Sequence, residues 1–240
     1  MLLPIGDDNT AINKTPLVTY ALIAANVLVW VLLQQMSGNS DFTYAYATVP
    51  AEILTGTDIV TKAYSEVDPY TGIKYLIPAL QPTNIPVYFT LFTAMFMHGS
   101  WMHLLGNLLY LFIFGDNLEH RLGKGRYLIF YLLTGVIASL SHVFSTYFLQ
   151  QSSIIPSLGA SGAISGVLGG YLILFPKLKV KAFFIFRIIT IPASLALGVW
   201  IAFQITSGLG GGGGGVAYAA HIGGFLAGIL LIKFFDRNRT

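Results

Sequence analysis

The chain has no cysteine and few charged residues, and both shortages narrow what it can be. Without cysteine there can be no disulfide and no thiolate metal site. Charged residues make up 10% of the 240 residues and hydrophobic residues 55%, whereas ordinary soluble domains contain about 25% charged residues. Residues 17–33 and 128–138 carry no charge at all. Apolar runs approaching about 20 residues match the hydrocarbon thickness of a bilayer, so the sequence predicts several membrane spans.

Two other absences concern the N-terminus and the basic residues. The segment MLLPIGDDNTAINK has two Asp and no basic stretch leading into an apolar one. This favours a short cytoplasmic lead-in, residues 1–15, over a signal peptide. The net charge of +3 comes from basic residues spread between the apolar runs. They form no dense block, so we expect no nucleic-acid partner. A chain of 240 residues with several spans leaves no room for a second globular unit, so we expect a single membrane domain, residues 1–240.

Six apolar segments account for the hydrophobic material. In hydrocarbon, backbone N–H and C=O groups must be satisfied within the segment, so each segment is predicted to be helical. The predicted fold class is therefore all-α, a polytopic bundle of six transmembrane helices in a lipid bilayer. The segments are residues 17–36, 101–115, 127–148, 161–175, 182–206 and 216–235.

The positions of Lys and Arg predict the orientation of these segments, because cytoplasmic loops are enriched in both. With both termini inside, only Lys62 and Lys74 lie outside, and the other 11 of the 13 basic residues lie at or near the inner face. We therefore predict an N-in, C-in topology. The inner basic residues are Lys14, Arg121, Lys124, Arg126, Lys177, Lys179, Lys181, Arg187, Lys233, Arg237 and Arg239.

Two loops are not simple turns. The first, residues 37–90, is too polar to span and too long for a turn, so we expect it to have a function or a structure of its own, partly in the outer interface. The fifth, residues 207–215, contains six consecutive glycines at positions 210–215. Such a run has little preferred conformation and can serve as a passive linker or as a moving gate.

Several polar side chains fall at membrane depth, where they are costly and are functional candidates by default. In the stretch HGSWMHLLGN, His103 and Asn107 are one helical turn apart and project from the same face, and His98 precedes them. Both can donate hydrogen bonds into a cavity, as an oxyanion requires. They could equally satisfy carbonyl groups of a neighbouring helix.

Ser161, in the stretch GASG, and His221, in AHIGGFLAG, lie in two segments that are rich in small residues. Small residues at four-residue spacing let two helix backbones approach closely, which would bring Ser161 and His221 together at similar depth. A Ser hydroxyl within hydrogen-bond reach of an imidazole is an activated nucleophile with its general base. The backbone N–H of Ser161, free at a helix start, can also donate to an oxyanion. The spaced glycines are Gly162, Gly166, Gly170, Gly224 and Gly228.

No acidic residue is placed to orient His221, because Asp116 and Glu119 fall on the opposite side of the membrane. The pattern therefore favours a Ser–His dyad over a Ser–His–Asp triad. There is no H-E-x-x-H motif, and histidines at membrane depth without a carboxylate make a poor zinc site. We predict no metal and no other cofactor.

Four motifs together resemble those of the rhomboid family of intramembrane serine proteases. HGSWMHLLGN is similar to the family's H-x-x-x-x-H-x-x-x-N, EHRLG to E-x-R-x-G, GASG to G-x-S-G, and AHIGGFLAG to A-H-x-x-G-x-x-x-G. They occur in the expected order, and the chain looks like the minimal six-span bacterial form. Two features depart from the pattern. Ser165 stands where some members have a Tyr, and the first loop lacks a Trp-Arg pair.

The resemblance implies a role for each motif residue. Ser161 would be the nucleophile and His221 the general base. The oxyanion hole would consist of His103, Asn107 and the backbone N–H of Ser161. The supporting residues would be His98, Gly159, Gly162, Gly224, Gly228 and an ion pair of Glu119 with Arg121 that braces the cytoplasmic turn.

The resemblance further implies what the protein acts on and where. Its substrates would be single-pass transmembrane proteins, cleaved near the outer leaflet of a bacterial plasma membrane. Two other functions stay open. A catalytically silent rhomboid-like protein would bind transmembrane helices for quality control or trafficking, but such a relative typically lacks the Ser or the His. A small-solute or proton transporter would need carboxylates and inverted repeats, and the sequence has neither in its spans. The sequence makes no prediction of the oligomeric state.

Overall fold

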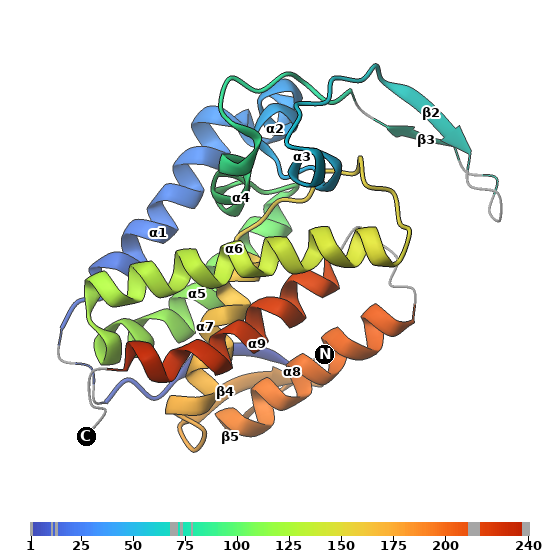
Figure 1. The fold of residues 1–240 in the computed structure, drawn as a ribbon. Coiled ribbons are helices and arrows are strands. Elements are labelled where there is room, and N and C mark those ends of the chain that lie inside the picture. The colour runs from blue at the N-terminus through green and yellow to red at the C-terminus, as the bar shows by residue number, and fades with distance from the viewer. Residues whose placement is uncertain are drawn as a thin grey trace.

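The structure is a computed structural model that describes residues 2–10, 12, 14–67, 72, 74–77, 79–210 and 217–236. It is mostly helical, as the sequence predicted (Figure 1). The helices are α1 (Leu17–Leu28), α2 (Ser40–Tyr46), α3 (Pro50–Thr55), α4 (Thr90–Thr93), α5 (Trp101–Leu122), α6 (Lys124–Phe148), α7 (Ser161–Leu174), α8 (Ala193–Leu209) and α9 (Tyr218–Phe235). The strands are β1 (Leu3–Asp7), β2 (Tyr64–Val67), β3 (Lys74–Ile77), β4 (Lys179–Phe184) and β5 (Arg187–Pro192).

Two of the described helices are long and apolar enough by themselves to cross a bilayer: α6, with 25 residues, and α9, with 18. Four shorter apolar helical stretches lie at Leu17–Leu33, Val87–Phe96, Ser161–Leu174 and Ala193–Leu209. The first of these includes a π-helical stretch, Val29–Leu33, that continues α1. The predicted second segment extends further than expected, because α5 continues to Leu122.

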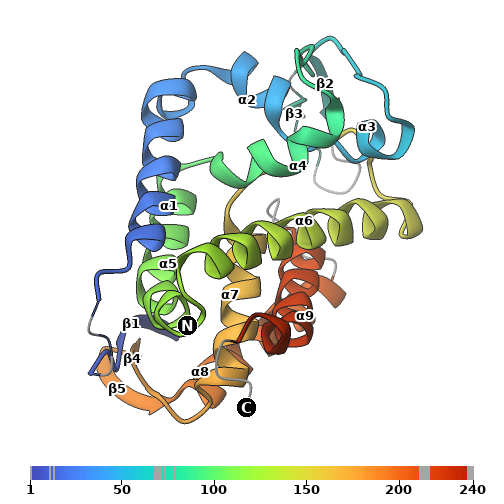
Figure 2. The same cartoon turned by 60° about the vertical axis from the view of Figure 1, so that its left-hand side comes forward.

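The predicted fifth helical segment, residues 182–206, is wrong over its first part. β4 and β5 form an antiparallel hairpin there, and α8 begins only at Ala193. β1, from the predicted lead-in, pairs with β4 and completes a three-stranded sheet in the order β1–β4–β5. Along β4, exposed Lys179 and Lys181 alternate with buried Val180 and Ala182, which is the period of a strand. The sheet lies at the end of α7 opposite Ser161 (Figure 2), so the all-α prediction is corrected by a small sheet.

The first loop has secondary structure of its own. It contains α2, α3 and the hairpin β2–β3, which extends away from the bundle (Figure 1). The loop is tied to the segment that precedes α7 by an antiparallel bridge between Thr48 and Ser157. The N–H of Thr48 donates to the carbonyl of Ser157 (3.0 Å), and the N–H of Ser157 donates back (2.8 Å). The first loop therefore helps to position the chain that leads into Ser161.

α7 is the central helix, with ten of its 14 residues buried. Glycines let its backbone lie directly against α9. A Cβ on Gly224 would overlap the carbonyl oxygen of Gly162, and a Cβ on Gly228 would overlap that of Gly166. The same glycines of α7 face α6, because a Cβ on Gly162 would come within 2.7 Å of the Cβ of Ala138. The close approach expected from the small-residue spacing is therefore present on two sides of α7.

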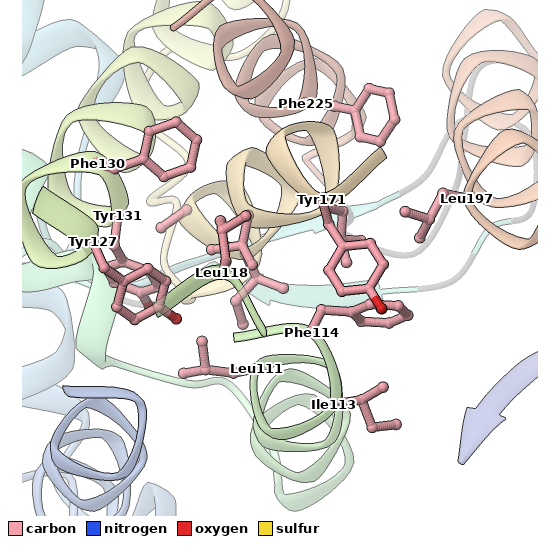
Figure 3. Close-up of a cluster of buried hydrophobic side chains, with 14 of the residues drawn as sticks. Leu111, Ile113, Phe114, Leu118, Tyr127, Phe130, Tyr131, Tyr171, Leu197 and Phe225 are labelled. Atoms are coloured by element: carbon pink, nitrogen blue, oxygen red, sulfur yellow. The ribbon is translucent and has the colours of Figure 1, made fainter. Parts of the chain in front are cut away.

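Aromatic side chains from α5, α6 and α7 fill the core toward the end of the bundle that carries the sheet. The rings of Phe114 and Tyr171 meet edge to face, with centroids 5.0 Å apart. Figure 3 shows Leu118 between this pair and the rings of Tyr127 and Tyr131. All five side chains are fully or almost fully buried, so this end of the bundle is a closed hydrophobic core.

The predicted ion pair between Glu119 and Arg121 is wrong. The carboxylate of buried Glu119 accepts hydrogen bonds from the backbone N–H groups of Val18 (3.0 Å) and Thr19 (2.8 Å) and from the Thr19 hydroxyl (2.9 Å). A carboxylate there satisfies free N–H groups at the start of α1 and complements the helix dipole. Arg121 instead pairs with both carboxylate oxygens of Asp236 at 2.8 and 2.9 Å. Residues two apart on a helix point in different directions, which explains the separate partners.

Candidate active site

Ser161 is the first residue of α7, and its hydroxyl meets an imidazole from α9. The Oγ of Ser161 lies 2.8 Å from Nε2 of His221, which is hydrogen-bond distance. The two residues are 60 positions apart in the chain. Gly162 directly follows Ser161, and Gly224 lies about one turn after His221. The backbone contact between these two glycines brings Ser161 and His221 together. Tight helix packing thus produces the contact between hydroxyl and imidazole.

The other ring nitrogen of His221 is held from α8. Nδ1 lies 2.7 Å from Oε1 of Gln204, a side chain with 7% exposure. An amide oxygen only accepts, so Nδ1–H donates to it, and Nε2 is left to accept from the Ser161 hydroxyl. The ring of Trp200, one turn earlier on α8, lies with its centroid 6.1 Å from that of the imidazole. Two residues of α8 therefore orient the His221 ring.

Neither Gln204 nor Trp200 was among the predicted site residues. A signal was available for Gln204, because it is the one amide side chain in α8 and lies within an apolar stretch. Ser165 stands at the position where some members of the resembled family have a Tyr, and it does not contact the His221 ring through an aromatic side chain. Its hydroxyl donates to the backbone carbonyl of Ser161 (2.6 Å), which is a local helix contact.

A cavity of about 910 Å³ lies beside the pair of Ser161 and His221. His103 and Asn107, from α5, line the same cavity, and so does His142 from α6. Asn107 is 7% exposed, and its Nδ2 is buried without a hydrogen-bond partner among the described residues. An unpaired buried amide donor is costly, which makes Asn107 a candidate for binding an oxygen of a substrate. The cavity thus brings together a serine hydroxyl, an imidazole that can accept its proton, and an amide side chain.

His98 and Gly159 pack against His103 and fix its place. The rings of His98 and His103 meet edge to face, with centroids 5.1 Å apart. The side-chain amide of Gln34 in turn pairs with the backbone N–H and C=O of His98, at 2.9 Å each. Gly159 has a φ of +127°, and a Cβ there would come within 2.7 Å of the His103 ring. The N–H of Gly99 donates a hydrogen bond to Nδ1 of His103 (3.4 Å). Because Nδ1 is the acceptor, the proton of the neutral His103 ring is on Nε2, which can act as a donor.

Two other expectations concern the glycine run and metals. Of positions 210–215 only Gly210 belongs to the described residues, at the end of α8. The alternatives of linker and gate therefore stay predictions that lie outside the described part of the chain. Within the described part, no group of three or more His, Cys, Asp or Glu side chains could hold a metal ion.

Most of the chain matches the model of one known protein family. The family model of the rhomboid domain matches residues 86–238, a range that includes α5 to α9 and every residue of the candidate site except Gln34. The chain belongs to the rhomboid family. This confirms the membership that the four sequence motifs predicted.

Individual rhomboid relatives are identical to this chain at about a third of the aligned positions. Rhomboid protein 1, mitochondrial, from Saccharomyces cerevisiae is 32% identical over 162 residues, which make up 65% of this chain and 44% of the relative. Rhomboid-like protein 11, chloroplastic, from Arabidopsis thaliana is 32% identical over 160 residues, 64% of this chain and 55% of the relative. Rhomboid protease GluP from Bacillus subtilis is 32% identical over 142 residues, 59% of this chain and 25% of the relative.

The matched region spans about half or less of the length of these relatives. Their names place two of them in organelles, and the third is a bacterial protein named as a protease. The comparisons therefore support an integral membrane protein of the rhomboid family, and they do not favour a bacterial plasma membrane over an organelle membrane.

Proposed function

We propose that this rhomboid is an intramembrane serine endopeptidase. The observation that carries the proposal is the hydrogen-bonded chain from Gln204 through His221 to Ser161, at the wall of the 910 Å³ cavity. A hydroxyl with its base at 2.8 Å and an acceptor behind the base are the parts that nucleophilic catalysis by serine requires. The Bacillus relative named as a protease supports the same activity.

In the proposed reaction, Nε2 of His221 takes the proton of the Ser161 hydroxyl while the oxygen attacks the scissile carbonyl carbon. The imidazolium then protonates the leaving amine, and a water molecule repeats the sequence to release the acyl group from Ser161. Gln204 accepts a hydrogen bond from Nδ1–H throughout and keeps the His221 ring in the productive tautomer. The Asp carboxylate has this role in a Ser–His–Asp triad. Because an amide is uncharged, it stabilises the imidazolium less than a carboxylate would.

Three donors would stabilise the tetrahedral oxyanion. One is Nδ2 of Asn107, which has no other partner among the described residues. Another is Nε2–H of His103, whose ring is fixed by its neighbours. The last is the backbone N–H of Ser161, at the start of α7, where N–H groups lack intrahelical acceptors and the helix dipole favours negative charge. Such donors stabilise the charge that develops in the transition state.

For substrates we propose single-pass transmembrane proteins whose helix is unstable near the cleavage point. A stable helix hides its carbonyl groups in its own hydrogen bonds, so the cavity would accept a segment that unwinds. We further propose six spans with both termini inside, the fifth being α8 (Ala193–Leu209), which begins later than the sequence suggested. The site would then face the outer leaflet. The relatives come from mitochondria, chloroplasts and a bacterium, and they favour no one kind of membrane.

The test is cleavage of a labile model transmembrane substrate by the reconstituted protein. Wild type is compared with Ser161→Ala and His221→Ala, and Ser165→Ala serves as the matched control, because it removes a hydroxyl one turn away. We expect cleavage by wild type and by the control, and background rates for the other two variants. Cleavage by Ser161→Ala would reject the proposed nucleophile. A wild type that binds the substrate helix without cutting it would favour the catalytically silent alternative.

A further inference from the structure

The β4–β5 hairpin has an apolar tip that no other described part of the protein covers. At the tip, Phe186 is 91% exposed and Ile185 67%. Both residues have positive φ angles, 64° and 41°, in the left-handed region that bulky side chains rarely adopt. Gly or Asn would form such a turn at lower cost. Large apolar side chains at this turn therefore need a reason other than the turn itself.

The pairing of the strands extends the apolar surface from the tip onto the outer face of the sheet. Phe183 pairs with Ile188 of β5 and with Leu3 of β1. Residues paired across strands share one face, and all three are exposed, at 42%, 64% and 38%. An isolated exposed apolar side chain needs no explanation, but a contiguous group marks a surface that binds something.

Basic residues border this apolar surface. The hairpin and its flanks, residues 176–192, carry four positive charges and no Asp or Glu. Lys181 is two residues from Phe183 on the same face, a separation of roughly 7 Å along a strand, so charge gives way to apolar surface over a short distance. The basic residues are Lys177, Lys179, Lys181 and Arg187.

The acidic side chain of Asp8 faces two of these cations, Lys179 and Lys181. The pKa of Asp8 is lowered, first by hydrogen bonds from Thr10 and then by the charges of Lys179 and Lys181. A single carboxylate offsets part of the positive charge of the four basic residues. The face therefore keeps a net positive charge beside its apolar tip.

The hairpin has no spacer that would carry it away from the membrane. β5 ends at Pro192 and α8 begins at Ala193. On the other side, α7 ends at Leu174 and β4 begins at Lys179. The hairpin is thus tied directly to the ends of two apolar helices. In the six-span arrangement proposed above, it lies at the level where lipid headgroups meet the hydrocarbon.

We propose that the β4–β5 hairpin is an anchor for anionic lipid, in the leaflet at the end of the bundle opposite Ser161. The tip, Phe184, Ile185 and Phe186, enters the top of the acyl chains. The four basic residues bind the phosphate groups above it, since clustered Lys and Arg at a membrane surface recognise anionic headgroups. An apolar tip with a positive border fits a lipid leaflet better than a soluble protein. This inference does not depend on the proposed protease activity.

The absence of cysteine makes a direct test possible, because Phe186→Cys creates the single attachment point for an environment-sensitive fluorophore. Gly125→Cys is the matched control. Gly125 is exposed, a Cβ there meets nothing within 4 Å, and it lies between two basic residues, Lys124 and Arg126, without an apolar tip. Both full-length proteins are reconstituted in phosphatidylcholine vesicles, with or without phosphatidylglycerol. Quenching is measured with a nitroxide lipid labelled near the top of the acyl chain, and with iodide on both sides of the bilayer.

We expect the label at position 186 to be quenched several-fold more by the nitroxide lipid, and several-fold less by iodide, than the label at position 125. Phosphatidylglycerol should increase the difference, and replacing all four basic residues of the hairpin by Gln should abolish that increase. Ile188→Cys gives an independent position and should behave like Phe186→Cys.

Three results would overturn the proposal. Iodide could reach position 186 as freely as position 125. The shielding could disappear when the protein is diluted with lipid, which would indicate contact with a second copy. The quenching could be insensitive to phosphatidylglycerol, which would remove the role of the basic residues.

Discussion

His221 is held between two helices that are packed in very different ways. α7 contacts α9 through backbone atoms, at Gly162 against Gly224, and most of α7 is buried. α8 buries only four of its 17 residues, and Gln204 is one of them. The separation of Ser161 from His221 is thus fixed by backbone contact in the core. The tautomer of His221 is set by one side chain of a helix at the edge. Distance and orientation have separate structural origins and can be tested separately.

The largest effect is expected from breaking the backbone contact. Gly224→Ala places a Cβ against the carbonyl oxygen of Gly162, and backbone atoms cannot move aside cheaply. We expect a loss of about 1–3 kcal/mol in the free energy of unfolding, and a fall in cleavage of ~10²-fold or more, because misplacement of the base by 1 Å can cost that much. Thermal unfolding and cleavage rates provide the measurement.

Gly198→Ala is the control for the backbone contact. Gly198 lies in α8, and a Cβ there meets nothing within 4 Å. Alanine is the better helix former, so this variant should be at least as stable as wild type. Equal stability and activity of Gly224→Ala and Gly198→Ala would contradict the role given to the α7–α9 contact.

The next effect concerns Asn107, the oxyanion donor that we propose on α5. Asn107→Ala removes the unpaired Nδ2 from a side chain that lines the cavity. We expect kcat to fall ~10²–10³-fold, the usual result of losing one such donor, with a smaller change in KM. Leu105→Ala, at a position with 53% exposure on the same helix, should leave kcat unchanged. An Asn107→Ala enzyme with normal kcat would remove Asn107 from the oxyanion hole.

A smaller effect should follow from changing the side chain on α8. Gln204→Leu removes the acceptor for Nδ1–H, and we expect kcat to fall about 3- to 10-fold, equivalent to a neutral hydrogen bond of ~0.5–1.5 kcal/mol. Gln204→Glu keeps the acceptor and adds charge. The carboxylate stabilises the imidazolium, so the acidic limb of the kcat/KM profile should move to higher pH. If Gln204→Leu leaves kcat unchanged and Gln204→Glu does not shift this limb, Gln204 serves packing alone.

The smallest effect is expected at the far end of α7, where Asp7 accepts hydrogen bonds from the hydroxyl of Tyr171 (2.5 Å) and from Nδ2 of Asn117 (2.9 Å). Burial raises the pKa of Asp7 to about 6. A raised pKa means that ionised Asp7 opposes folding at neutral pH, and that this cost is relieved as pH falls through about 6 toward the unfolded value near ~3.9. Tm should therefore gain from acidification between these limits.

Asp7→Asn should reduce the gain in Tm on acidification and leave cleavage at neutral pH unchanged, because Asp7 is far from Ser161 at the other end of α7. Comparing Tm across the pH range for wild type and variant gives the measurement. Parallel curves for the two proteins would show that Asp7 does not titrate as described.

The candidate site was predictable to the extent that it depends on local spacing. One helical turn between His103 and Asn107 places both on one face, and the four-residue period of glycines indicates which faces meet. The structure accordingly brings Ser161 and His221 into contact and places the α5 residues in the same cavity. Gln204 is conspicuous as the one amide side chain in the apolar α8, but its role depends on how α8 packs against α9, which the sequence of α8 does not specify.

The parts of the fold that were predicted wrongly depend on similar contacts. Residues 182–192 are as apolar as a membrane helix, so composition alone suggested a helix there. They form strands because β4 pairs with β1, a segment that is distant in the sequence. Glu119 and Arg121 are close in sequence and opposite in charge, which suggested an ion pair. Each instead meets a group more than 90 residues away, Glu119 at the start of α1 and Arg121 at Asp236. Long-range partners of this kind are set by tertiary packing.

We propose that packing of α7 on α9 makes Ser161 a nucleophile activated by His221, and covalent labelling with a fluorophosphonate probe tests this claim. This measurement needs no knowledge of the substrate. We expect the label on Ser161 in wild type and in Ser165→Ala, no label in Ser161→Ala, and labelling slowed at least ~10²-fold in His221→Ala, because the general base is lost. Labelling of Ser161 at the wild-type rate in His221→Ala, or of a different serine in wild type, would contradict the claim.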